Sequence, residues 1–195
     1  MVGTSSASQT AELGRSRKRV NIRKAHGFAL IDLVFVCGMI GLLSSIAVPK
    51  MLMARQSAAA ASAIGSLRAI NSGELTYALT CASGFYAPNL TTLGTPPAGS
   101  SEPFITPGLG MADTVTKANY IFQLTGTAYA SAPGTCNGLA GGLAAQAYKV
   151  GADAAEPTNT RFFATNASGQ IFEDTASLFA AMPEVDPPAS GHILQ

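Results

Sequence analysis

The chain has 195 residues, of which 47% are hydrophobic and only 12% are charged. That apolar content excludes a fully disordered chain, and a charged fraction about half of the usual ~25% indicates that part of the chain lies outside water. The formal net charge is +1, but six of the twelve basic residues lie within residues 15–24. The chain after residue 27 is mildly acidic, which argues against nucleic acid as a partner.

Residues 1–27 form a basic leader, and an apolar run from Phe28 to Val48 follows it with Asp32 as its single ionisable residue. As a helix this run covers about 30 Å, enough to cross a bilayer once. The basic flank predicts that the N-terminus is cytoplasmic and that the rest of the chain lies outside. The alternative is a cleaved secretory signal ending near residues 45–47, but such signals have apolar regions of roughly 7–15 residues.

Asp32 needs an explanation because a carboxylate at the centre of a spanning helix costs about 2.5–3.5 kcal/mol. One hypothesis is that Asp32 reaches the headgroups from its place near the helix end. In the other, cleavage between Gly27 and Phe28 creates an ammonium four residues before Asp32, and the two charges offset each other's desolvation. Pro49 predicts a kink, or a local unwinding of residues 41–48.

The combination of basic leader, Gly27, Phe28, Asp32 and Pro49 resembles the type IV pilin and type II secretion pseudopilin family over residues 23–80. The resemblance implies cleavage after Gly27 by a prepilin peptidase, N-methylation of Phe28, and assembly through the hydrophobic helix. The chain departs from the family pattern in two ways: Asp32 stands where the family usually has Glu, and the leader of residues 1–27 is long. Without this combination, a simple single-pass anchor would explain the helix and its small residues.

Several partners and a location follow from the same resemblance. The implied partners are further copies of the chain in a filament, the prepilin peptidase and N-methyltransferase, and an inner-membrane assembly platform with its ATPase. The expected location is the inner membrane, with one span, and later a pilus or pseudopilus. The function expected is that of a type IV pilus subunit, and the alternative is a pseudopilin of a type II secretion system.

Beyond Pro49, an Ala-rich segment predicts that the helix continues to about residue 80 and packs an apolar stripe on a small antiparallel sheet, which gives an α+β fold. Strands are expected at residues 120–125, 145–150, 161–165 and 170–173, with a hairpin turn at 166–169. The stripe is expected to comprise Ala54, Ala58, Ala61, Ile64, Leu67, Ile70 and Leu75, with Glu74 on the opposite, polar face. The predicted organisation is a leader at 1–27, a transmembrane helix at 28–49, an amphipathic stem at 50–83, an irregular connector at 84–118, a sheet head at 119–182 and a poorly ordered tail at 183–195.

The three cysteines have different expected roles. Cys37 lies in the apolar run and is expected to act as a small hydrophobic residue. Cys81 and Cys136 both fall on the outer side, in an oxidising compartment, so they are expected to form a disulfide. The alternative is two free thiols.

The sequence matches none of the common catalytic motifs, so no enzymatic activity and no required cofactor are predicted. The resemblance to major pseudopilins allows Ca²⁺ at Glu173 and Asp174, or at Asp153 and Glu156, which are expected in a loop. Asn89 and Asn166 begin triplets of the glycosylation acceptor type, a pattern that is common by chance. A membrane-anchored extracytoplasmic enzyme or binding domain is the alternative from a different functional class.

Overall fold

The computed structural model describes residues 26–194, and the surroundings of side chains from residue 30 onward. The chain divides into two compact units, residues 1–49 and residues 50–195. We call the described part of the second, residues 50–194, the head unit. Residues 1–25 of the predicted leader lie outside the described residues.

One helix, α1, extends over 55 residues from His26 to Thr80. It continues through Pro49 and through residues 41–48, so the predicted local unwinding is wrong. The helix persists because proline removes a single backbone donor, while good helix formers such as Ala, Met and Leu surround it. Its end at Thr80 is as predicted, and the amides of Cys81, Ala82 and Gly84 bond the carbonyls of its last turn.

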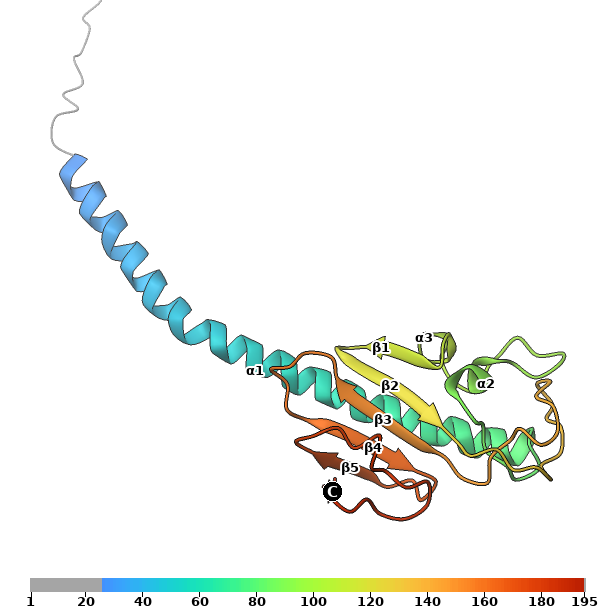
Figure 1. The fold of residues 1–195 in the computed structure, drawn as a ribbon. Coiled ribbons are helices and arrows are strands. Elements are labelled where there is room, and N and C mark those ends of the chain that lie inside the picture. Colours follow the sequence, from blue (N-terminus) through green and yellow to red (C-terminus); the bar gives the residue numbers. More distant parts are fainter. Residues whose placement is uncertain (1–25, 195) are drawn as a thin grey trace, which may run out of the picture. The chain divides into compact units, whose positions relative to one another are not determined.

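Six antiparallel strands form one sheet in chain order, so the predicted α+β class is confirmed (Figure 1). The strand at 120–125 was predicted with its observed bounds, those at 161–165 and 170–173 lie one residue too early, and that at 145–150 lies four residues too early. The strands are β1 (Thr114–Lys117), β2 (Tyr120–Thr125), β3 (Lys149–Ala154), β4 (Phe162–Asn166), β5 (Ile171–Asp174) and β6 (His192–Ile193).

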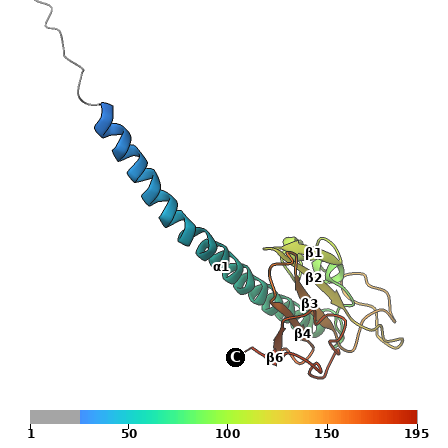
Figure 2. The same cartoon turned by 60° about the vertical axis from the view of Figure 1, so that its left-hand side comes forward.

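Residues 60–80 of α1 pack along one face of this sheet and, together with the sheet, form the main core of the head unit (Figure 2). Strand β2 shows why, because Tyr120, Phe122 and Leu124 alternate with more exposed residues and turn the same way. The buried positions of α1 follow the three- and four-residue spacing of one side of a helix. Within the described residues they are Ala60, Ala63, Ser66, Leu67, Ile70, Gly73, Glu74, Tyr77 and Ala78, and Cys81, directly after α1, is buried as well.

The predicted inward stripe is therefore only partly right. Leu67 and Ile70 are fully buried and Ile64 is partly buried, but Leu75 is 54% exposed. The Ala residues predicted to face the sheet, at positions 54, 58 and 61, are exposed as well. Alanine occurs on every side of this segment and cannot define a face, so the buried side is set by where the large residues meet the sheet.

The opposite face of the sheet is covered by the segment after β5. Leu178 and Met182 from this segment pack on Ala164 and Phe172. Phe179 lies so close to β3 that a Cβ placed on Gly151 would come within 2.7 Å of its side chain. The sheet is thus sandwiched, and glycine at position 151 makes room for the covering segment.

Residues 84–118 contain regular structure, which corrects the prediction of an irregular connector. They form α2 (Leu90–Gly94), α3 (Pro107–Gly110) and strand β1. The two short helices meet where a Cβ on Gly94 would overlap the backbone of Gly110. The Gly and Pro residues that indicated a loop therefore serve close helix contact and helix initiation.

The tail at 183–195 was predicted to be poorly ordered, and this is also wrong within the described residues. Strand β6 pairs with β5, and the amide of Leu194 donates to the carbonyl of Ile171 at 2.9 Å. Leu194 also packs on the main core. The backbone and hydroxyl of Thr127 both donate to the Glu184 carboxylate. Partners distant in sequence anchor the tail, and local composition does not report them.

Candidate functional site

The first candidate site is the apolar segment of α1, residues 30–48. Its large apolar side chains are exposed on every side of the helix, with values such as 67% for Ile31, 73% for Leu42 and 65% for Ile46. A helix that is apolar all round is suited to a lipid or protein interior rather than to water. By length and composition this part of α1 meets the requirement for one membrane span.

Asp32 is the only acidic or basic side chain in that segment, and it is exposed. The peptide bond between Gly27 and Phe28 lies in the first turns of α1, although nothing is described of the side chains there. Residues four apart share a helix face, so Phe28 and Asp32 are neighbours on α1. The backbone thus allows the predicted amine–carboxylate pair, while the processing itself remains a prediction.

The same segment offers surfaces for close helix contact. A Cβ placed on Gly38 or Gly41 would meet nothing within 4 Å, so both glycines leave the backbone open. Cys37 is a free, exposed cysteine beside them. The small residues let another helix approach, which is how helices associate without a hydrophobic driving force in lipid.

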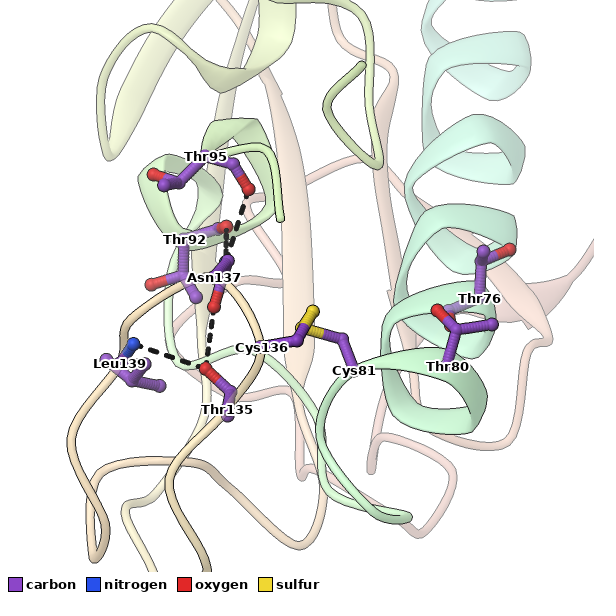
Figure 3. Close-up of a disulfide and its surroundings, with 9 residues drawn as sticks. All are labelled: Thr76, Thr80, Cys81, Thr92, Thr95, Thr135, Cys136, Asn137 and Leu139. Atoms are coloured by element: carbon purple, nitrogen blue, oxygen red, sulfur yellow. Dashed lines mark hydrogen bonds between the residues drawn. A yellow bond between two sulfur atoms is a disulfide. The ribbon is translucent and has the colours of Figure 1, made fainter. Parts of the chain in front are cut away.

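The second feature is the disulfide between Cys81 and Cys136, which confirms the predicted pair (Figure 3). It joins the residue directly after α1 to the loop between β2 and β3, and the Cys136 amide also donates to the Cys81 carbonyl at 3.1 Å. From the same loop, the side-chain Nδ2 of Asn137 donates to the carbonyls of Thr92 and Thr95 at the end of α2. The covalent link and these bonds fix the loop to both helices.

Glu74 is a site residue that the sequence reading missed, because it was placed on the polar face. It is fully buried, and its Oε2 accepts a hydrogen bond from the Ala87 amide at 2.9 Å. Its Oε1 has no partner among the described residues. Burial raises the pKa of Glu74 well above its ordinary value, and the Ala87 bond only partly opposes this. The signal available in the sequence was the spacing of Leu67, Ile70, Glu74 and Tyr77.

Of the acidic residues considered for Ca²⁺, Glu173, Asp174 and Asp153 accept hydrogen bonds from the head itself, whereas the carboxylate of Glu156 is exposed and accepts none within the described residues. Arg161 bonds Glu173 through two nitrogens and lowers the pKa of this carboxyl. Asp153 lies in strand β3, not in a loop, and it accepts the hydroxyl of Ser177. Within residues 26–194, no group of three or more His, Cys, Asp or Glu side chains is arranged to hold a metal ion.

The two glycosylation-type triplets have structural roles. Asn89 caps α2, and its Oδ1 accepts the Thr92 amide at 2.9 Å. Asn166 is fully buried, and its side-chain Nδ2 donates to the carbonyls of Pro183 and Asp186. A glycan could not be attached to Asn166 in the folded head.

A cavity of about 350 Å³ lies between the first turns of α1 in the head unit and the loops around residues 119 and 156–158. Arg55 and Glu156 are its charged lining residues. Its lining does not include a nucleophile paired with a base, the arrangement that acyl-transfer enzymes require. Comparison with protein-family models, with curated proteins and with solved structures finds no match to this chain.

Proposed function

We propose that this chain is the structural subunit of a type IV pilus, made as a prepilin and assembled through its N-terminal helix. The observation that carries the proposal is the contrast along α1. Residues 30–48 expose large apolar side chains on all sides with one carboxylate at Asp32, whereas residues 60–80 use one side to pack on an antiparallel sheet. One helix therefore combines a lipid-compatible segment with the core of a folded head.

A filament subunit must move its apolar segment from lipid into a protein environment. A segment that is apolar all round suits both surroundings, and Gly38 and Gly41 permit close contact with further copies. Burying the Asp32 carboxylate in lipid or in a protein interior costs free energy of desolvation unless a positive charge accompanies it. Cleavage after Gly27 supplies that charge as the Phe28 amine, either on the same copy or on a neighbouring one.

The proposal includes the partners that such processing needs. A prepilin peptidase cuts between Gly27 and Phe28, an N-methyltransferase modifies Phe28, and an inner-membrane platform with an ATPase extracts the subunit. The basic leader stays cytoplasmic and the head unit lies outside. The disulfide between Cys81 and Cys136 supports an extracytoplasmic head, because such bonds persist in oxidising compartments.

The decisive experiment is mass analysis of the N-terminus of the native protein. The expected chain begins at a methylated Phe28. The Gly27→Leu variant should remain uncut in the membrane, and Gly27→Ala serves as the conservative control. A native chain that begins at Met1, or close to Pro49, would contradict the proposal.

Asp32 allows a second test in the same cells. Asp32→Ala should be cut normally but should not enter fibres, because the amine then loses its carboxylate. Asp32→Glu, which keeps the charge, should assemble. Sheared extracellular fibres that contain the chain support a pilus, whereas a secretion defect without such fibres supports the pseudopilin alternative.

A further inference from the structure

The part of α1 within the head unit, residues 50–80, exposes cations but no carboxylate. Its exposed charged residues are Lys50, Arg55 and Arg68. The only acid in this stretch, Glu74, is fully buried on the sheet side, where its raised pKa favours the neutral form. The exposed side of residues 50–80, which we call the stem surface, is therefore positively charged.

The remainder of the head unit has the opposite balance. Residues 81–194 contain three Lys or Arg residues and eight Asp or Glu residues. Two of those cations are engaged within the head, since Arg161 pairs with Glu173 and Lys149 lies over the Phe179 ring. The net charge of the head is thus divided along the sequence, with only cations exposed on the stem surface and an excess of carboxylates in residues 81–194, of which Glu156 lines the same cavity as Arg55.

The charges of the stem surface are free to act on a partner. Among the described residues, Lys50, Arg55 and Arg68 form no ion pair, even though Arg55 and Glu156 line the same cavity. Three exposed carboxylates likewise accept no side-chain hydrogen bond within the described part of the chain. They are Glu102, Glu156 and Asp186.

Between its cations the stem surface carries a row of small residues, over which another molecule can approach the helix closely. Ala54, Ala58, Ala61 and Gly65 are exposed there, and a Cβ on Gly65 would meet nothing within 4 Å. Two stem surfaces facing each other would bring like charges together, which disfavours that pairing. A partner of negative net charge relieves the repulsion, and residues 81–194 of the same head, with eight acidic and three basic residues, have that charge.

We propose that the stem surface of one copy docks on the acidic carboxylates of a second copy of this chain. The contact is heterologous, since it joins the stem surface of one copy to a different part of the other copy. Such a contact repeats without closing on itself and so generates an open filament. The inference deepens the proposed function, on which it rests, by naming the head surfaces that meet when the apolar helices assemble.

The test is sedimentation of the full chain in nonionic detergent micelles at low and at high ionic strength. The wild type should associate more strongly at low salt, because exposed ion pairs are screened by salt. Arg55→Glu with Arg68→Glu should weaken association by about tenfold or more, with Arg55→Ala and Arg68→Ala intermediate. Glu and Arg have similar helix propensities, so far-UV circular dichroism should show that α1 is retained.

The matched control is Lys117→Glu with Lys149→Glu, which changes the net charge equally but away from the stem surface, and it should leave association close to wild type. Combining Glu102→Lys, Glu156→Lys and Asp186→Lys with Arg55→Glu and Arg68→Glu should restore association. The inference would be overturned if the chain with Arg55→Glu and Arg68→Glu associated as strongly as the wild type. It would also be overturned if the association of the wild type did not depend on salt. A native chain that begins at Phe28 combined with either result would refute the charge contact and leave the proposed function standing.

Discussion

Glu74→Gln should remove a pH-dependent loss of stability from the head unit. Glu74 is fully buried with a single hydrogen bond, and burial raises its pKa well above the ordinary value of 4.5. In the unfolded chain the carboxyl loses its proton near that ordinary value, whereas in the folded chain it keeps the proton to higher pH. Between the two pKa values the folded state holds more protons, so the free energy of unfolding falls as pH rises.

The free energy of unfolding falls by about 1.4 kcal/mol for each pH unit between the unfolded and the folded pKa of such a group. The contribution of Glu74 is therefore fully present below the unfolded pKa and is lost as pH rises through the folded pKa. Glutamine does not titrate and its amide oxygen can still accept the Ala87 bond, so the variant should lack this slope.

The assay is denaturant unfolding of the full chain in detergent micelles at several pH values between about 4 and 8. The chain contains no Trp, so near-UV circular dichroism of the buried tyrosines Tyr77 and Tyr120 reports on the packed head. The difference between the variant and the wild type should widen by about 1.4 kcal/mol per pH unit above the ordinary pKa of glutamate.

Glu102→Gln is the matched control, because it makes the same chemical change at an exposed carboxyl. It should follow the wild-type pH dependence. A constant difference between Glu74→Gln and the wild type across this pH range would refute the reasoning, because it would show that Glu74 ionises equally easily in both states.

Three further predictions concern the packing of the head. Replacing Cys81 and Cys136 by Ala should lower the free energy of unfolding by about 4 kcal/mol, from the chain entropy of a loop closed across a sequence separation of 55, and thermal unfolding with and without reductant measures it. Gly151→Ala should cost about 1–3 kcal/mol, since its Cβ would come within 2.7 Å of Phe179, and Gly65→Ala, with open space, is the control in the same unfolding assay. Arg161→Met should cost less than about 1 kcal/mol near neutral pH, because the ion pair with Glu173 is partly exposed. That contribution should disappear in acid as the lowered pKa of Glu173 is passed, and a loss that is unchanged at low pH would contradict an ionic role.

The α+β class and the long helix could be predicted because their signals are local. An apolar run of 21 residues, followed by an Ala-rich segment without Pro, indicates a helix whatever surrounds it. Alternating residues such as those of β2 likewise indicate a strand with one buried face. The disulfide followed from the compartment implied by the basic leader and the apolar segment.

The misplaced elements depended on partners distant in sequence. Strand β1 is a strand because it pairs with β2, and β6 because it pairs with the edge of β5, although the Gly- and Pro-rich residues before each indicate loops. Glu74 was assigned to the solvent because its charge favours water. Its burial follows from its place between Ile70 and Tyr77 on the side of α1 that faces the sheet.

The sequence by itself determined those features that depend on one segment of the chain alone. They are a helix long and apolar enough for a membrane span, three of the strands to within a residue, and the candidate residues Gly27, Phe28 and Asp32 along that helix. Tertiary structure alone decided which side of the Ala-rich stem is buried, where the tail is anchored, and that the stem surface shows only cations. Periodicity in a short segment specifies that a face exists, but when alanine occupies every side only the docking of larger residues on a sheet selects which face it is.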